Sequence, residues 1–473
     1  MKQELRKIHM GEAKLALDLS DGSERGEYVD QDYILGVLGR PHRNVNLMYT
    51  YYPKDKQWPQ RISEACKDME INFQWDYPYD DYFPYGAEGE PFASMQDIRK
   101  HGQDVTLTLT IDCSLEDSYL RKIAQELRPY GRMRIRINHE CAGDWFTHNR
   151  RFSFKEIADF FVRFAKILKE EAPNVKTIFC GGASMEEGKP VAHEEDFIEA
   201  YKIADIWSYD CYLALHFGWP YDVAEKGDGG RWTASSVEHY YQLFKRTAKR
   251  LTELTGEAKP MITGEFNTDG DVTGSLRQGE SVIRFAKKLR DEKVDWFHGI
   301  TYYQFRDRGR LGLELEDPSN KHHGIPLPIL KEYKELLKDP YFMPQVSDQG
   351  KVELPFTFRW GGAEDAEGLE LTVPFEASPE FCEITLQEDL NLMLEINGKW
   401  FYKAPSVKTI DLMPAFFENP LTSAKDLELK IFATPKDGVN INDGREDWDI
   451  NYYATMTEMP ELRIRYESVQ DVK

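Results

Sequence analysis

Two glutamates stand where a pair of acids could act on one substrate. Glu140 ends a segment of alternating apolar and polar residues at 132–140, and Glu265 ends a largely apolar segment at 260–266. Hydrolysis of a glycosidic bond needs one protonated carboxyl for the leaving oxygen and one ionised carboxylate that attacks the sugar carbon. Different surroundings can separate the pKa values of two such groups. Either glutamate alone fits a structural salt bridge equally well, so the elements that position them decide.

The segment that ends at Glu140 has one strongly polar face. Successive side chains of a strand point to opposite faces, so Met133, Ile135 and Ile137 share one face. The other face carries Arg134, Arg136, Asn138 and Glu140. Burying such a face is costly unless its groups are paired. The segment is therefore either a solvated edge strand with an internal ion pair or a barrel strand that delivers a carboxylate at its C-terminal end.

The surrounding chain alternates predicted strands with predicted helices. Strands are predicted at 44–52, 71–77, 104–112, 132–140, 176–180, 204–212, 260–266 and 296–305. Such alternation favours parallel pairing, and eight units over roughly 300 residues favour a closed (β/α)8 TIM barrel. We predict an α/β fold with the barrel at 43–340, preceded by a lead-in at 1–42 that packs on it. Residues 14–20 of the lead-in could form a short strand. No GxGxxG follows the strand at 44–52, which weighs against a dinucleotide fold.

The pattern changes after Pro340 and Pro344. Short alternating segments follow, separated by turn residues, and Asn397-Gly398 is a typical hairpin turn. No helical pattern of convincing length appears there. Residues 346–473 are therefore predicted to form a C-terminal all-β sandwich domain.

A barrel places the C-terminal ends of its strands on one rim, where the active sites of such folds lie. Glu140 and Glu265 end the fourth and seventh predicted strands, so both should reach that rim. Arg136 shares the face of Glu140 and could pair with a carboxylate there. The sixth strand ends in Tyr209-Asp210-Cys211-Tyr212, and the eighth ends near Tyr303.

Three motifs resemble a known family. Arg136-Ile-Asn-His-Glu140 followed by Gly143-Asp-Trp-Phe146 resembles the signature of glycoside hydrolase family 26, a member of the retaining (β/α)8 clan A. The segments 204–212 and 263–266 are similar to the sixth and nucleophile strands of that clan. The resemblance implies that Glu140 is the general acid/base and Glu265 the nucleophile of a retaining enzyme that cleaves β-glycosidic bonds in a poly- or oligosaccharide. Thr147-His148-Asn149-Arg150 stand where the family usually has further aromatics, so the clan is the better-supported level.

The same resemblance implies roles for residues around the pair. Tyr212 would orient Glu265, and Asn138 and His139 would touch sugar hydroxyls near the scissile bond, although His139 could instead pack behind the strand. Aromatic faces suit the C–H faces of sugar rings. Trp75, Trp145 and Tyr303 are therefore candidate sugar platforms, although each could simply be packed.

Composition limits the partners. The net charge of −22 argues against nucleic acid and anionic membranes, and no apolar run of about 18 residues exists for a membrane span. We expect a carbohydrate substrate, no cofactor and no metal. The sequence does not indicate the oligomeric state.

The N-terminus lacks the apolar core of a signal peptide, so a cytoplasmic location is expected unless a leader has been removed. The six scattered cysteines are expected to be reduced thiols.

Two other functions fit parts of the sequence. A metal-dependent barrel hydrolase would need clustered histidines, and His139, His148, His216 and His298 are present without a His-x-His on the first strand. A non-catalytic carbohydrate-binding protein would not need both glutamates.

Overall fold

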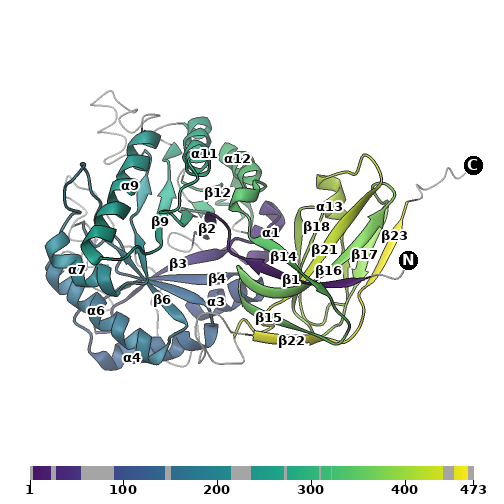
Figure 1. The fold of residues 1–473 in the computed structure, drawn as a ribbon, viewed down its shortest axis with the longest axis horizontal. Helices are drawn as coiled ribbons and strands as arrows, with labels where there is room; N and C mark the ends of the chain where they lie inside the picture. Colours follow the sequence, from purple (N-terminus) through teal and green to yellow (C-terminus); the bar gives the residue numbers. More distant parts are fainter. Residues whose placement is uncertain are drawn as a thin grey trace, which may run out of the picture.

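A computed structural model describes residues 4–22, 28–54, 90–143, 151–214, 236–270, 274–307, 311–320, 322–439 and 452–466. The chain forms a barrel of parallel strands with helices around it, and a β-sandwich beside the barrel (Figure 1). The predicted fold class is confirmed.

Eight parallel strands close the barrel, because the last pairs with both the seventh and the first. In order they are β2 (Ala16–Ser20), β3 (Asn44–Tyr51), β4 (Asp104–Ile111), β5 (Met133–Ile137), β6 (Val175–Cys180), β7 (Ile206–Ser208), β9 (Met261–Asn267) and β10 (Gly299–Tyr302). The two-residue β8 (Cys211–Tyr212) adds to the end of β9.

The first two strands differ from the prediction. Residues 16–20 of the predicted lead-in form the first barrel strand, while the predicted strand at 71–77 lies outside the described residues. β3 pairs directly with β4 from Asn44↔Asp104 to Tyr51↔Ile111, so no strand is inserted between them. The predicted strand at 44–52 is therefore second in the barrel, and the segments that carry the two glutamates keep their places as fourth and seventh.

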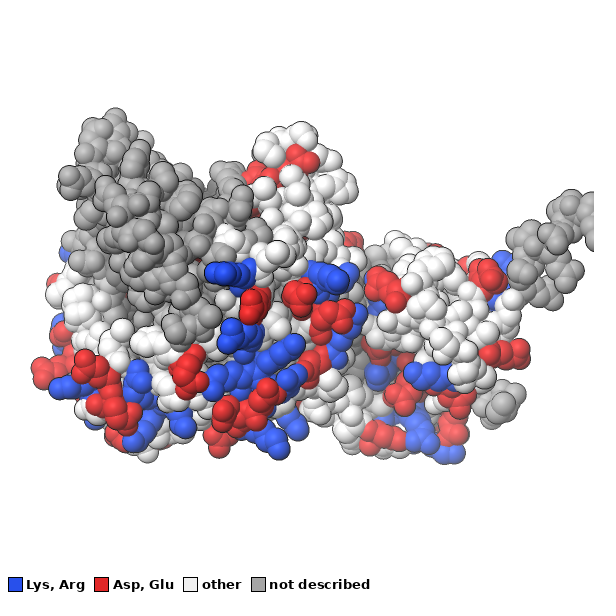
Figure 2. All heavy atoms as spheres, turned by 90° about the horizontal axis from the view of Figure 1, so that it is seen from above, with Lys and Arg blue, Asp and Glu red and all other residues white. Residues whose placement is uncertain are grey.

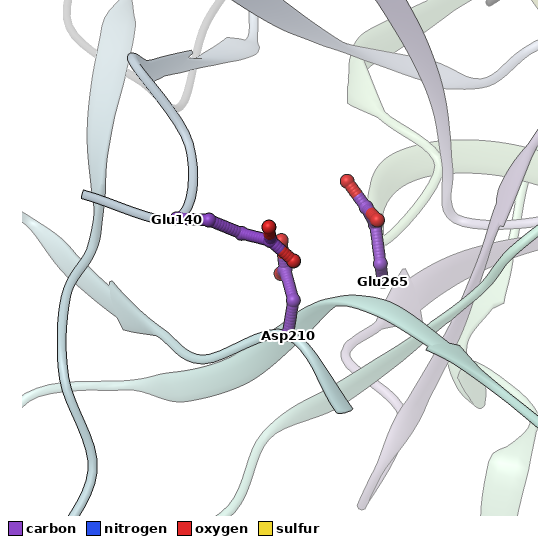
Figure 3. A group of neighbouring side chains, drawn as sticks. All are labelled: Glu140, Asp210 and Glu265. Carbon is purple, nitrogen blue, oxygen red and sulfur yellow. The ribbon is translucent and has the colours of Figure 1, made fainter. Parts of the chain in front are cut away.

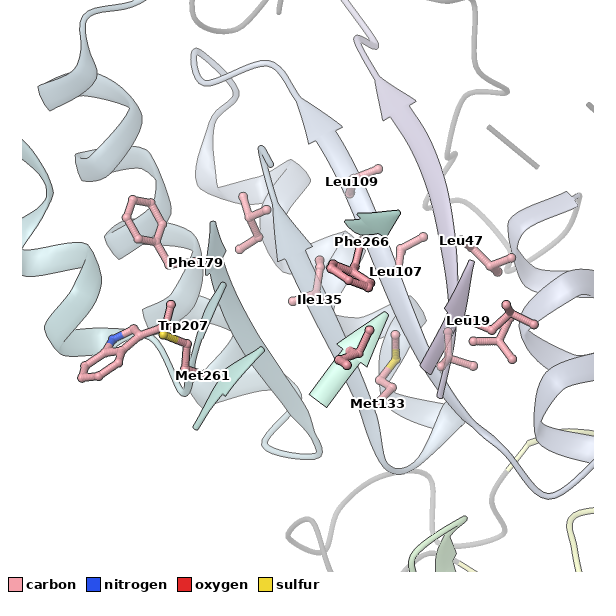
Figure 4. Packing of buried hydrophobic residues seen from close by; sticks show 14 of the residues in the cluster. Leu19, Leu47, Leu107, Leu109, Met133, Ile135, Phe179, Trp207, Met261 and Phe266 are labelled. Carbon is pink, nitrogen blue, oxygen red and sulfur yellow. The ribbon is translucent and has the colours of Figure 1, made fainter. Parts of the chain in front are cut away.

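Helices cover the outside of the barrel. They include α1 (Gln31–Leu38), α3 (Glu90–Lys100), α4 (Asp117–Leu127), α6 (Phe154–Glu171), α7 (Glu194–Ile203), α9 (Ser236–Thr255), α11 (Ser275–Asp291) and α12 (Pro328–Leu336). Helix α6 begins with a capping box, in which Ser153 and Glu156 bond each other's backbone N–H groups. The outward strand residues, such as Leu107, Ile135 and Trp207, form one apolar cluster with the helices (Figure 4). This packing leaves the inward residues free to build a site.

The barrel interior is polar on one side and apolar on the other. Thr106 and Thr108 of β4 donate hydrogen bonds to Asn44 and Asn46 of β3, each at 2.7 Å. On the opposite side β6, β7 and β9 contribute a small cluster of three isoleucines, Ile178, Ile206 and Ile262. The buried polar side belongs to β2–β5, which include the strand with the unusual polar face.

The C-terminal part contains two antiparallel sheets. The larger includes β14 (Gln345–Lys351), β15 (Phe356–Gly362), β16 (Asp365–Phe375), β18 (Leu392–Ile396), β19 (Lys399–Lys403), β21 (Lys425–Ala433) and β22 (Tyr452–Met456). The smaller consists of β17 (Phe381–Thr385), β20 (Thr409–Asp411) and β23 (Glu461–Arg465). A short helix, α13 (Met413–Glu418), was not predicted.

The N-terminal segment joins both parts of the molecule. Strand β1 (Leu5–Gly11) pairs with β14 and β16 of the larger sheet, directly before β2 enters the barrel. The turn between β15 and β16 in turn places Glu364 against the barrel, where its carboxylate accepts from the Ala13 N–H at 3.2 Å and lies 3.9 Å from Arg43. At Gly362, whose φ is +146°, an added Cβ would lie 2.1 Å from a carboxylate oxygen of Asp104. The sandwich and the barrel therefore share a close, partly ionic contact.

The described residues bear on membrane spans, cysteines and surface charge. None of its helices is long and apolar enough to cross a membrane. Five cysteines are free and buried, at 113, 141, 180, 211 and 382, as expected of reduced thiols. On the described part of the face in Figure 2, acidic and basic side chains are interleaved, so the acidic surplus does not form one patch there.

Candidate active site

Three carboxylates from different strands meet at one end of the barrel. Glu140 follows β5, Asp210 follows β7, and Glu265 lies near the C-terminal end of β9. One oxygen of each lies within 4.8 Å of one oxygen of each of the others (Figure 3). Because the strands are parallel, their C-terminal ends share one rim, and the predicted convergence of Glu140 and Glu265 is present in the structure.

Glu140 is delivered by a sharp change in the backbone. The strand ends at Ile137, and Asn138 and Glu140 both have positive φ, at 50° and 52°. Left-handed backbone is uncommon for residues other than glycine and must be stabilised by its surroundings. The Asn138 side chain stabilises this bend. Its Oδ1 accepts from the Ile111 N–H at 2.7 Å, and its Nδ2 donates to the Cys113 sulfur at 3.2 Å. The predicted alternation of faces therefore stops at Ile137, and Glu140 is partly exposed while Asn138 is buried.

Glu265 is held by two donors. Arg136 Nη2 donates to one carboxylate oxygen at 2.8 Å, and the Tyr212 hydroxyl donates to the other at 2.7 Å. The carboxylate is buried, with the whole residue 6% exposed. Both carboxylate oxygens are therefore bound, and the orientation of the Glu265 side chain is fixed. The expected contact between Tyr212 and Glu265 is thus present.

Arg136 is the centre of a hydrogen-bonded chain across the barrel interior. Its Nε donates to Thr108 Oγ1 at 2.9 Å, and Thr108 donates to Asn46 as described above. Asn46 Nδ2 donates to Ser20 Oγ of β2 at 2.9 Å. Burial lowers the pKa of Arg136, but Asp210 and Glu265 outweigh burial and raise it. The guanidinium is therefore a fixed positive charge, held by a chain of hydrogen bonds that runs from β5 through β4 and β3 to β2.

Asp210 is the carboxylate that the sequence analysis did not assign. Both of its oxygens accept from Arg136 Nη1, at 2.8 and 2.9 Å. Burial raises the pKa of its carboxyl to about 7 against the opposing effect of Arg136, and the nearby charge of Glu265 adds to the rise. The signal that could have found it was Arg136. A guanidinium in mid-strand needs a buried anion, and Asp210 lies at the end of another strand of the same barrel.

Gly264 makes room for this ion pair. A Cβ on Gly264 would lie 2.1 Å from Arg136 Nη1 and 2.7 Å from Asp210 Oδ1. Glycine next to Glu265 is thus required by the close approach of Arg136.

Replacing Gly264 with alanine is expected to lower the free energy of unfolding by about 2–4 kcal/mol, because the methyl group overpacks the site and displaces a buried ion pair. Urea unfolding followed by intrinsic fluorescence measures this. Gly36→Ala in α1 is the matched control, since its Cβ meets no atom within 4 Å. Equal unfolding midpoints for Gly264→Ala and the wild type would contradict the close approach.

The other predicted site residues fall into two groups. His139 is buried, its Nδ1 lies 3.3 Å from Thr110 Oγ1, and burial followed by the charge of Arg136 holds its pKa well below the usual value. Tyr303 is also buried, in a cluster with Met48, Leu311 and Tyr212. Trp75 and Trp145 lie outside the described residues.

The three carboxylates could also be considered as ligands of a metal ion. Glu140, Asp210 and Glu265 are, within the described ranges, the group of potential ligands close enough to surround one ion. Arg136 already occupies both oxygens of Asp210 and one of Glu265, so the positive charge that this group needs is supplied by the chain. His298 accepts from the Met261 N–H, away from the three acids, and His148 and His216 lie outside the described residues.

Comparison with known proteins was made at the level of both sequence and structure. No protein-family model matches the chain, and no curated protein matches it. Among solved structures, the chain is similar to a family 26 β-mannanase from Bacteroides ovatus, with 11% identity, 69% of this chain and 89% of that chain covered, and a TM-score of 0.40.

Two further structures cover more of the chain. A family 51 α-L-arabinofuranosidase from Bifidobacterium longum has 11% identity, covers 89% of this chain and 97% of its own, and has a TM-score of 0.42. A glucosidase from Croceicoccus marinus has 10% identity, covers 89% and 99%, and has a TM-score of 0.44.

Proposed function

We propose that the chain is a retaining glycoside hydrolase that cleaves β-glycosidic bonds in a poly- or oligosaccharide by double displacement. The observation that carries the proposal is the separation of the two glutamates, whose nearest oxygens lie within 4.8 Å. Retaining enzymes place their carboxyl groups about 5–5.5 Å apart, whereas inverting enzymes leave roughly 6.5–9.5 Å for a water molecule. The proposed substrate is a neutral carbohydrate, and the proposed mechanism uses no metal or cofactor.

In the first step Glu140 acts as the general acid. It gives its proton to the glycosidic oxygen while a Glu265 oxygen attacks the anomeric carbon, so the bond to the leaving group breaks and a glycosyl ester forms. Glu265 suits this role because Arg136 and Tyr212 donate to its two oxygens and fix its orientation. Glu140 suits the acid role because it is the more exposed of the two and can reach an entering substrate.

In the second step Glu140 acts as the general base. Its carboxylate takes a proton from water, the water oxygen attacks the anomeric carbon, and the ester bond to Glu265 breaks. Glu265 returns to its ionised state beside Arg136, and Glu140 regains its proton. Two inversions at one carbon give a product of the original configuration.

The remaining residues are proposed to support these two. Arg136 and Tyr212 position Glu265, while Asn138 and His139 fix the bend that carries Glu140. Tyr303 packs edge-to-face with Tyr212, their ring centroids 6.0 Å apart, and so holds that phenol in place. Trp75 and Trp145 are proposed as platforms for sugar rings, as their sequence context suggested.

The stereochemistry of the product tests the proposal. Proton NMR during hydrolysis of an aryl β-glycoside, chosen from a panel of sugars, is expected to show the β-anomer of the free sugar first and the α-anomer only after mutarotation. First appearance of the α-anomer would assign an inverting mechanism and overturn the double displacement. Absence of hydrolysis across a broad panel of aryl glycosides and polysaccharides would overturn the enzyme assignment itself.

A further inference from the structure

A third carboxylate lies beside the proposed acid and has no part in the double displacement. Asp210 approaches Glu140 and Glu265 so closely that one oxygen of each of the three lies within 4.8 Å of the others. In Figure 3 the Glu140 side chain extends from its own loop toward the Asp210 carboxylate, while Glu265 rises from a separate strand. Asp210 therefore lies close to both glutamates.

Asp210 and Glu265 are bound by the same guanidinium. Arg136 supplies one guanidinium, which divides its N–H groups between Asp210 and Glu265. Two carboxylates already share this single positive charge, and the Glu140 carboxyl lies within reach of both of them. When one of these carboxyl groups is ionised, its charge disfavours ionisation of the next. A proton is therefore retained among them.

The groups that face Asp210 come from several elements. They are Arg136 of β5, Glu140 and Cys141 after β5, Cys180 of β6, Glu265 of β9, and the flanking Tyr209 and Cys211. Cys180 donates to Asp210, and Arg136 is the cation of this group. In the proposed function Glu265 attacks as a carboxylate, so the retained proton is assigned to Asp210 and Glu140.

We propose that Asp210 and Glu140 share one proton, and that the buried charge of Asp210 keeps this proton on Glu140 when a glycosidic oxygen is bound. Asp210 is thus a positioning residue that acts through Glu140, and this inference rests on the proposed function. When Glu140 protonates the leaving oxygen, both carboxylates become anions and Arg136 balances part of their charge. The proton that Glu140 later takes from water restores the pair.

The inference is supported by the fixed geometry of Asp210. Both of its oxygens are bound by Arg136, and its side chain is 1% exposed, so the carboxylate can neither turn away nor be screened by solvent. Burial raises the pKa of Asp210, as described above, so this carboxyl can itself carry a proton near neutral pH. A buried aspartate with a purely structural role would need only its contact with Arg136.

Asp210→Asn tests the inference, because it removes the charge and keeps the shape. The measurement is kcat/KM against pH on two aryl glycosides, one with a good and one with a poor leaving group. Loss of the neighbouring anion lowers the pKa of Glu140, so the alkaline limb is expected to move to lower pH by about one unit. At pH 7–8 the poor leaving group, which needs the acid, is expected to lose roughly tenfold more rate than the good one.

Controls separate the inference from the proposed function. Asp159→Asn removes a 59% exposed aspartate side chain and is expected to leave the profile unchanged. Equal losses on both substrates with an unmoved alkaline limb would assign Asp210 a purely structural role and overturn the inference, with Glu140 and Glu265 still required. An absence of turnover in the wild type would instead overturn the proposed function.

Discussion

Glu265→Ala is expected to reduce hydrolysis of an aryl β-glycoside by on the order of 10⁵-fold, because the variant cannot form the glycosyl ester. The loss should appear in kcat, since the substituted group lies beneath the sugar and contributes little to ground-state binding. Steady-state assays with a chromogenic leaving group measure it. Glu187→Ala, which removes a 74% exposed glutamate side chain, is the matched control and should retain full activity.

Azide is expected to restore part of the lost rate and to reveal the face of attack. Removal of the carboxylate leaves Arg136 Nη2 and the Tyr212 hydroxyl without their acceptor, and a small anion can occupy that space. Attack from the position of Glu265 inverts the anomeric carbon, so the product should be an α-glycosyl azide. Near-normal activity without azide, or a β-glycosyl azide as the product, would contradict the assignment of Glu265 as nucleophile.

The fold was predictable where the hydrophobic pattern was strong. Residues 104–112 alternate branched apolar residues with threonines, and the structure places Val105, Leu107 and Leu109 against the helices and the threonines inside. Residues 14–20 were predicted as a possible short strand of the lead-in but not as the first strand of the barrel, because the strand is five residues long and its inward positions are Asp18 and Ser20. Polar residues at inward positions resemble a loop until their partners in other strands are known.

The site was predictable in part for a related reason. A parallel barrel must bring the ends of its fourth and seventh strands to one rim, so Glu140 and Glu265 followed from strand order alone. The contact of Arg136 with Asp210 depends on the register between strands and on the missing Cβ of Gly264, which a single sequence does not specify. The bend at Asn138 also escaped prediction, because its positive φ is stabilised by contacts with residues 111 and 113 of a neighbouring segment.

Glu140→Ala is expected to behave differently from Glu265→Ala, and the difference identifies the acid. Without Glu140, a glycoside with a poor leaving group should lose about 10²–10⁴-fold in kcat/KM, because its leaving oxygen must depart without a proton. A dinitrophenyl glycoside needs no such help, so its kcat/KM should stay within roughly tenfold of the wild type. Its kcat should fall, since water attacks the glycosyl ester slowly without the base, and the KM should fall with it as the ester accumulates.

The same variant offers an independent check on the two roles. Azide needs no general base, so it should speed turnover of the dinitrophenyl glycoside by attacking the ester on Glu265 and give a β-glycosyl azide. Opposite anomers from Glu140→Ala and Glu265→Ala would place the two glutamates on opposite faces of the sugar. Equal losses on both leaving groups would instead mean that Glu140 does not donate the proton. The acid would then have to be sought at Asp210, whose pKa is raised by burial.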